Sequence, residues 1–159
     1  MKSRKGLLLM VGLCLMAFTG LKANSTSNEI KDNIFTAIRS IDYVSINVLL
    51  SDGVNIDTVD QEGNTPLMVA AQIGNPRIVD IILSHKADVN KQNNMGETAL
   101  MIAAKTGQLE IVEKLVSHNA NILTRNINGN TAVTLASKFG HNKIVSFLKG
   151  VQTQSAFAK

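Results

Sequence analysis

Residues 60–74 read DQEGNTPLMVAAQIG, and this pattern returns at residues 93–107 as NNMGETALMIAAKTG and again at residues 126–140 as NINGNTAVTLASKFG. Four columns keep the same register through the three copies: Gly63, Gly96 and Gly129; Thr65, Thr98 and Thr131; Ala70, Ala103 and Ala136; Gly74, Gly107 and Gly140. The copies are 33 residues apart. A fixed period of this length predicts an architecture of repeated structural units.

A degenerate fourth copy precedes these three. Its residues Ala37, Ile46, Leu50, Asn55 and Asp57 lie one period before Ala70, Val79, Leu83, Asp88 and Asn90. Four copies of one unit therefore cover most of the chain.

Each copy predicts two antiparallel helices followed by an extended turn. Thr65 can cap a helix that begins at Pro66, because proline lacks the N–H that has no partner there. Pro76 begins the second helix in the same way, and its apolar stripe consists of Ile78, Val79, Ile82 and Leu83. Small residues such as Ala70 let neighbouring helices approach closely. No copy can bury its apolar face alone, so the copies must stack.

These residues resemble the ankyrin repeat, whose signature combines a Gly-x-Thr-Pro-Leu turn, Ala-Ala, a glycine, a second helix ending Leu-Leu and a Gly-Ala-Asp-Val-Asn loop. The matching segments are residues 63–67, 70–71, 74, 81–83 and 87–90. The resemblance implies an all-α solenoid of stacked helix-turn-helix units with short β-hairpin-like turns. We place the repeats at about residues 27–59, 60–92, 93–125 and 126–150, within a domain over residues 24–150.

The chain departs from the family pattern at two kinds of position. Met68, Met101 and Thr134 replace the usual histidine of the turn, which predicts a weaker local hydrogen-bond network. The second helices end at Gly53, Lys86 and Asn119, where the family usually has glycine. A left-handed Lys86 would cost roughly 1 kcal/mol relative to glycine, so Lys86→Gly is expected to stabilise the protein.

Both ends of the repeat array resemble caps. Asp32 stands where later copies have threonine, and Lys149 stands where Leu83 and Val116 point toward a following repeat. A charge at that position indicates that the stack ends there, because terminal repeats need a polar outer face. We expect the tail from Gly150, assigned as residues 151–159, to fray.

Residues 1–23 predict a secretory signal peptide. Residues 1–5 are basic, residues 6–18 are apolar and uncharged, and residues 19–23 are more polar, which is the order found in such leaders. The apolar run is short for a permanent membrane anchor, the alternative reading, which takes about 20 residues. Cleavage is expected after Ala23 or, alternatively, after Gly20.

Composition excludes several classes of function once the leader is set aside. Four of the 16 basic residues lie within residues 1–23, which contain no acid, so 12 basic and 12 acidic residues remain. A neutral chain argues against nucleic-acid binding, which needs a surplus of Lys and Arg on one surface. The single cysteine, Cys14, is also in the leader, and the bulky Leu13 before it disfavours a lipid anchor. The remaining chain has no disulfide and no cysteine nucleophile.

We find no convincing catalytic or metal site in the sequence. His85 and His118 occupy equivalent helix ends about 8 to 10 Å apart and lack a recurring third ligand. His141 stands where the family usually has a structural histidine. Asp57 and Asp88 lie in turns, where such side chains cap backbone groups. We expect no enzymatic activity, no cofactor and no metal.

In ankyrin proteins, partners are usually held on the concave face, which the turn tips and the exposed side of the first helices form. The resemblance places on this face Val59, Gln61, Glu62, Asn64, Gln72, Ile73, Gln92, Asn94, Met95, Glu97, Lys105, Thr106, Arg125, Ile127, Asn128, Asn130, Lys138 and Phe139, with Arg39 and Ser40 from the first copy.

This set mixes amide side chains with apolar residues that the fold would expose: Val59, Ile73, Met95, Ile127 and Phe139. An apolar line bordered by Gln, Asn, Arg and Lys has the composition of a protein-binding patch. We expect Phe139, Ile127, Met95 and Arg125 to be the main anchors. The alternative for each is that it packs against its own turn.

The sequence therefore predicts an exported, non-enzymatic protein-binding module, periplasmic or secreted, that is monomeric until bound. Its expected partner is another exported protein, for instance a periplasmic cell-wall enzyme that it inhibits or regulates as a self-protection protein. Two alternatives stay open: a secreted effector that binds a host protein, and a small-molecule or metal-binding stress protein. We expect no nucleic-acid partner, and no membrane contact after the leader is cleaved.

Overall fold

The computed structural model describes residues 34–157, with side chains described as far as Thr153. The predicted signal peptide, the start of the first repeat and Asp32 lie outside this part of the chain. The described residues contain helices and no strands. The helices are α2 (Tyr43–Ser51), α3 (Pro66–Ile73), α4 (Pro76–Ser84), α5 (Ala99–Thr106), α6 (Leu109–Ser117), α7 (Ala132–Lys138) and α8 (Asn142–Phe157). Residues 34–39 form a further helical segment.

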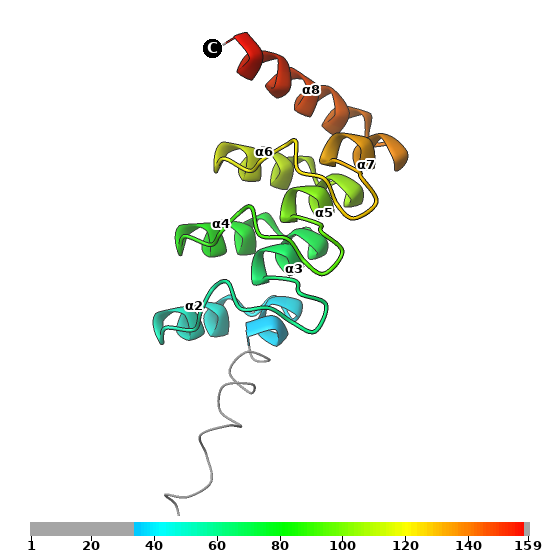
Figure 1. The fold of residues 1–159 in the computed structure, drawn as a ribbon. Coiled ribbons are helices and arrows are strands. Elements are labelled where there is room, and N and C mark those ends of the chain that lie inside the picture. Colours follow the sequence, from blue (N-terminus) through cyan, green and yellow to red (C-terminus); the bar gives the residue numbers. More distant parts are fainter. Residues whose placement is uncertain (1–33, 158–159) are drawn as a thin grey trace, which may run out of the picture.

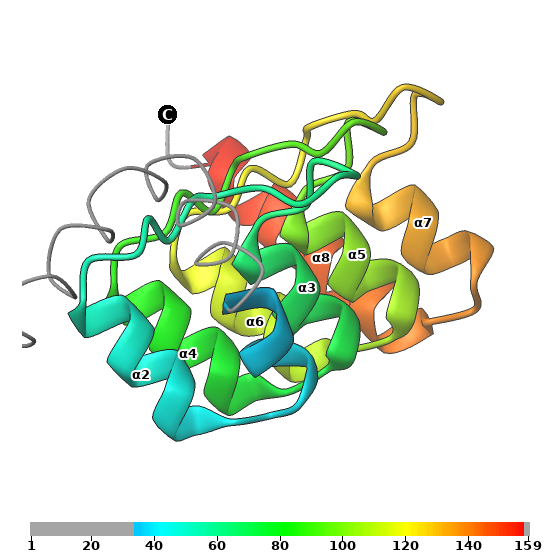
Figure 2. The ribbon, with the colours of Figure 1, turned by 90° about the horizontal axis from the view of Figure 1, so that it is seen from below.

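The helices stack in pairs along one axis (Figure 1). The segment 34–39, α3, α5 and α7 form one layer, α2, α4 and α6 form the other, and α8 closes the stack at its C-terminal end. The connecting turns project side by side from the helical layers (Figure 2). The predicted all-α solenoid is confirmed. No helix within residues 34–157 is long and apolar enough to cross a membrane.

Threonine caps begin the first helix of each later repeat, as the sequence predicts. The Oγ1 atoms of Thr65, Thr98 and Thr131 each accept a hydrogen bond at 3.3 Å from the N–H group three residues later. Methionine partly substitutes for the missing turn histidine, because the Sδ of Met68 accepts from the Thr65 N–H at 3.4 Å. In the last repeat the Thr134 hydroxyl accepts the equivalent bond at 2.8 Å.

The core runs without interruption along the stack, because each helix pair buries its apolar side against the next pair. Ala70, Ala103 and Ala136 are fully buried at the centre of the first-helix layer, and Ile78 and Ile111 are fully buried in the second. Alanine at these positions allows the close helix contacts that larger side chains would prevent. The buried area is thus shared between repeats, which makes each repeat depend on its neighbours.

Ionic and aromatic contacts also join the second helices. Lys114 of α6 donates a hydrogen bond to Asp80 of α4 at 2.9 Å, and this bond raises the pKa of Lys114 above its ordinary value. Between the first two repeats, the guanidinium of Arg77 lies 4.5 Å from the centre of the Tyr43 ring, and the Tyr43 hydroxyl accepts from Asn75 at 3.0 Å. Contacts one repeat apart therefore recur along this layer.

Within residues 34–157, three residues other than glycine have a positive φ, and two of them lie where the family usually has glycine. Lys86 (φ 62°) and Asn119 (φ 63°) end α4 and α6 in the left-handed conformation, which Gly53 adopts at the equivalent position. The third is Ile41, with φ 57°. It occupies the position of Gly74 and later glycines, and a β-branched side chain is strongly disfavoured in this region.

Helix α8 continues past Gly150 to Phe157, so the segment assigned as the C-terminal tail begins as part of this helix. The earlier second helices stop before a left-handed residue and an Asn or Asp that forms the next loop. At the corresponding positions the C-terminal segment has Gln152 and Gln154. Glutamine is a good helix former and does not compete for the backbone as asparagine does, so the sequence contains no stop signal there.

Candidate functional site

One side-chain oxygen organises each of the three turns. The Oδ1 of Asp60 accepts hydrogen bonds from the N–H groups of Glu62 at 3.0 Å and Asn64 at 2.8 Å. Asn93 and Asn126 accept the equivalent pairs at 2.9 to 3.0 Å. In each turn the N–H of this residue also donates at 3.0 Å to the carbonyl four residues later. This geometry confirms the predicted hairpin-like turns.

Neighbouring turns are bonded to one another. The N–H of Asn94 donates to the Glu62 carbonyl and that of Ile127 donates to the Met95 carbonyl, both at 3.1 Å. The Asn93 side chain donates to the Asn64 Oδ1 at 2.8 Å. Gly63 permits this approach, because a Cβ there would lie 2.6 Å from the Asn94 Oδ1. The turn tips therefore form one continuous, pre-organised edge.

A second set of bonds joins the loops that follow the second helices. The Oδ1 of Asp57 accepts from the Asp88 N–H at 3.0 Å, and the Oδ1 of Asn90 accepts from the Asn121 N–H at 2.8 Å. The predicted backbone-capping role of Asp57 is confirmed. Asp88 caps the N–H of Asn90 in the same manner, at 2.9 Å.

Hollows lie between the turns and the first-helix layer, and we call this side the concave face. One, of about 250 Å³, is lined by Glu62, Gln72, Met95, Lys105 and other residues of two adjacent repeats. A second, of about 360 Å³, lies between the segment 34–39 and the first turn and includes Arg39. These residues belong to the set that the sequence placed on this face.

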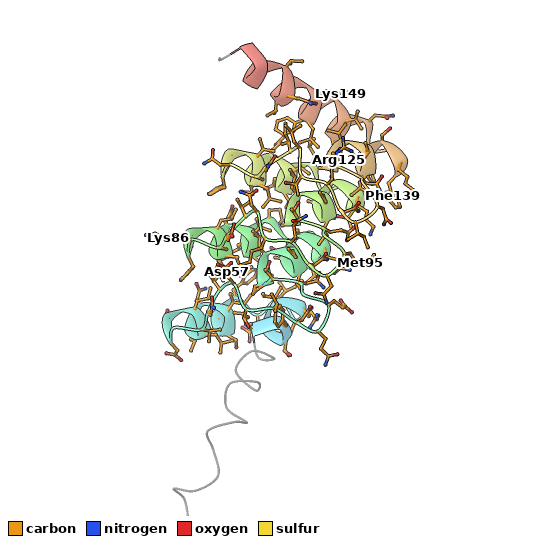
Figure 3. The ribbon with its side chains drawn as sticks, viewed as in Figure 1. Asp57, Lys86, Met95, Arg125, Phe139 and Lys149 are labelled. Carbon is orange, nitrogen blue, oxygen red and sulfur yellow. The ribbon has the colours of Figure 1, made fainter. Side chains whose placement is uncertain are left out.

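Four apolar residues are exposed on the turns and helix ends of this face: Val59 at 47%, Met95 at 49%, Ile127 at 66% and Phe139 at 49%. Met95 and Phe139 lie along the same side of the stack, opposite Lys86 (Figure 3). Water contact at these side chains is unfavourable, and covering them would be a source of binding energy. Ile73 is half-buried and packs against the core.

The expected exposure is wrong for Asn64, which is only 9% exposed. Its side chain donates to Glu62 at 3.0 Å and accepts from Asn93, so it holds two turns together. Glu97 and Asn130 are half-buried. The remaining predicted residues are exposed: Gln61, Glu62, Gln72, Gln92, Asn94, Lys105, Thr106, Arg125, Asn128 and Lys138, with Arg39 and Ser40.

Two of these exposed side chains also brace their own turn. The Gln92 Nε2 donates to the Gly96 carbonyl at 2.7 Å, and the Arg125 Nη1 donates to the Gly129 carbonyl at the same distance one turn later. A guanidinium has five N–H donors. Arg125 is therefore held in place and retains donors that face solvent.

Charges are distributed unevenly along the concave face. Arg39 pairs with Asp60, and Lys105 pairs with Glu97, each at 3.5 Å. The position of Glu97 is taken by Asn130 in the last turn, and within the described residues neither Arg125 nor Lys138 forms an ion pair. The C-terminal half of the face is therefore the more positive half.

The histidines have structural contacts. His85 and His118 end α4 and α6, and their Nδ1 atoms lie 2.9 and 2.8 Å from the carbonyl oxygens four residues earlier. The Nε2 of His141 lies 3.1 Å from the Lys105 carbonyl, across the repeat boundary. Among residues 34–157, no group of three or more His, Cys, Asp or Glu is placed to hold a metal ion.

Further apolar residues, which were not predicted from the sequence, are also exposed. Leu123 is 60% exposed in the last loop, and Val44 and Val48 of α2 are 73% and 51% exposed. The exposure of Val44 in α2 could have been predicted from the sequence. Val44 aligns with the charged residues Arg77, Glu110 and Lys143 of the later repeats, and charged residues at one position indicate that it faces solvent. These residues lie outside the concave face.

Comparison with known families agrees with this architecture. The model of the ankyrin-repeat family, which describes three copies, matches residues 34–126 and, in a second match, residues 75–156. The chain therefore belongs to the ankyrin-repeat family, whose members are protein–protein interaction modules. A comparison with curated proteins finds no match.

Proposed function

We propose that the protein is an exported, non-enzymatic binding module that holds another exported protein on its concave face. The observation that carries this proposal is the set of exposed apolar residues on the concave face: Met95 and Ile127 on the pre-organised turns, and Phe139 at the end of α7. Rigid turns reduce the ordering cost of binding, and Phe and Met are enriched in the cores of interfaces.

The leader supports the exported location, since its basic, apolar and polar segments follow the order of a signal peptide. We further propose that the partner is a periplasmic enzyme, for instance one that acts on the cell wall, and that binding covers its active site. Steric occlusion suits a chain whose described part is one small repeat domain. Inhibition of this type would protect the producing cell.

The test expresses the full tagged chain in its native cell, crosslinks it and identifies the recovered proteins by mass spectrometry in each cell fraction. We expect one stoichiometric partner that Ile127→Asp/Phe139→Asp no longer captures. Val44→Asp is the control, because it places a charge on an exposed apolar residue outside the concave face.

The recovered enzyme is then assayed with and without the purified protein, and inhibition is expected. A double variant that captures the same partner would contradict the concave-face proposal. A partner found only in the medium or in a host cell would replace the periplasmic target with the secreted-effector alternative.

A further inference from the structure

We infer that the C-terminal half of the concave face binds an acidic protein segment that carries apolar side chains. This inference rests on the proposed function and specifies the chemistry of the partner. The kind of partner follows from the cations next to Ile127 and Phe139, and from the lack of carboxylates that pair with these cations.

The N-terminal half of the face has no excess of positive charge. Its cation, Arg39, is paired with Asp60, and Glu62 adds a further carboxylate. In the C-terminal half, Lys105 is paired with Glu97, whereas Arg125 and Lys138 have no carboxylate partner within the described residues. The unpaired cations therefore lie in the half that contains the most exposed apolar side chain of this face, Ile127.

The two cations directly flank the apolar anchors. Lys138 precedes Phe139 at the end of α7, and Arg125 lies two residues before Ile127 in the last turn. A partner that covers these anchors also removes water from the neighbouring cations. Desolvating a charge without a counter-charge is costly, so a partner with carboxylates at these places is favoured over a neutral or basic one.

The geometry holds one of these cations ready. The hydrogen bond from Arg125 to the Gly129 carbonyl at 2.7 Å fixes the guanidinium along the turn, and its other N–H groups can form the paired bonds that carboxylates accept. Two unpaired cations and one aromatic residue are too few for a nucleic acid, which needs several phosphate contacts or a series of stacking rings.

The repeats themselves supply substitutions that remove these charges with little change in structure. Gln92 stands at the position of Arg125 in the preceding turn and makes the equivalent bond to a glycine carbonyl. Gln72 stands at the position of Lys138 in α3. The variant Arg125→Gln/Lys138→Gln therefore uses residues that the same fold already accepts. Lys143→Gln/Lys149→Gln removes two exposed charges from α8 and is the matched control.

The experiment selects random twelve-residue peptides by display on protein purified after expression of the full chain. Peptides that also bind Ile127→Asp/Phe139→Asp are discarded. We expect the retained peptides to combine Asp and Glu with apolar residues. Fluorescence anisotropy should then show about tenfold weaker binding to Arg125→Gln/Lys138→Gln, unchanged binding to the α8 control, and weakening with added salt.

Each of the other possible results contradicts either the acidic partner alone or both proposals. Retained peptides that are neutral or basic, or that bind Arg125→Gln/Lys138→Gln as tightly as the wild type, refute the acidic partner and leave the proposed function standing. The acidic partner is also refuted, in favour of a lipid surface, if acidic peptides are not enriched and the protein sediments with phosphatidylglycerol vesicles only when Arg125 and Lys138 are present. No peptide that distinguishes wild type from Ile127→Asp/Phe139→Asp counts against both proposals.

Discussion

The two ends of the stack are finished differently. At the C-terminal end, polar residues replace the apolar ones that contact a following repeat in the interior. Thr134 replaces Met68 and Met101, Ser137 replaces Ala71 and Ala104, and Lys149 replaces Leu83 and Val116; all three replacements are exposed. These three replacements form a polar cap of the kind that terminal repeats need.

Among its described residues, from Ile34 on, the N-terminal repeat has only part of such a cap. Ser45 replaces the buried Ile78 of the next repeat, but Val44 and Val48 remain exposed and Ile41 is held in the left-handed conformation. The comparison teaches that capping depends on individual side chains. Polar side chains replace the apolar ones more fully at the C-terminal end than in the described part of the first repeat. We therefore expect the first repeat to be the less stable end of the described stack.

Matched truncations of the two terminal repeats give the largest expected effect. Ile144 and Ile46 are both buried, at 1% and 0% exposure. Ile144→Ala should lower the free energy of unfolding by about 3 kcal/mol. Ile46→Ala should lower the global value by only about 1 kcal/mol, because a weakly coupled repeat opens separately. Urea denaturation and amide hydrogen exchange measure the two effects, and equal losses would show that both ends are equally coupled.

Relief of backbone strain at the N-terminal end comes next. Ile41→Gly should stabilise the protein by about 1.5 kcal/mol, since glycine adopts the left-handed conformation freely. The reciprocal change at the other end is Gly140→Ala, where φ is 78° and an added Cβ would meet no atom within 4 Å. It should destabilise by about 1 kcal/mol through conformation alone. If Ile41→Gly leaves the melting temperature unchanged, backbone strain at Ile41 is not the cause of the lower stability of this end.

The interior repeats offer a smaller effect at the end of each second helix. The first repeat already has glycine here, at Gly53, whereas the interior repeats have Lys86 and Asn119. At this position the backbone strain is therefore in the interior repeats and not in the first repeat. Lys86→Gly should stabilise by about 1 kcal/mol and Asn119→Gly by a few tenths, because asparagine tolerates the left-handed conformation better. Melting temperatures rank the two variants, and an unchanged or lower value for Lys86→Gly would refute the argument.

The fold was predictable because its determinants are local and recur with one period. The threonine caps, the proline helix starts and the left-handed positions each depend on residues within one turn of the chain. The bond that Asp88 accepts from the Asn90 N–H follows the same logic, whereas Asp57 accepts from the Asp88 N–H of the next repeat. The continuation of α8 beyond Gly150 was not predicted, because the repeat period ends there and the helix continues only through the absence of stop residues.

The concave face was less predictable, because exposure depends on a neighbour one repeat away. Asn64 is buried since Asn93 bonds to it from the next turn, whereas Asn130, which occupies the equivalent position in the last of the three turns, is half-buried. Exposure of Met95, Ile127 and Phe139 was predicted correctly from the family resemblance. Their role in binding stays a prediction, as does the exported location.

The smallest effect is a pH dependence that distinguishes the helix caps of the first two repeats. Asp42 caps α2 by accepting from the N–H groups of Val44 and Ser45, both at 3.1 Å, and Asn75 caps α4 in the same way without titrating. The hydrogen bond from the Ser45 hydroxyl, followed by the backbone bond from Ser45, lowers the pKa of the Asp42 carboxyl below its ordinary value of 3.8.

A carboxyl group whose pKa is lower in the folded state stabilises the fold above its unfolded-state pKa, and this contribution is lost as pH falls through the folded-state pKa. The stability difference between wild type and Asp42→Asn should therefore shrink as pH falls below about 4. Asn75→Asp should introduce the same dependence into the second repeat. Urea denaturation at pH 7, 4 and 2 measures both. A difference that does not change with pH would show that the Asp42 carboxylate is replaced fully by a neutral cap, leaving backbone strain at Ile41 as the main distinction of the first repeat.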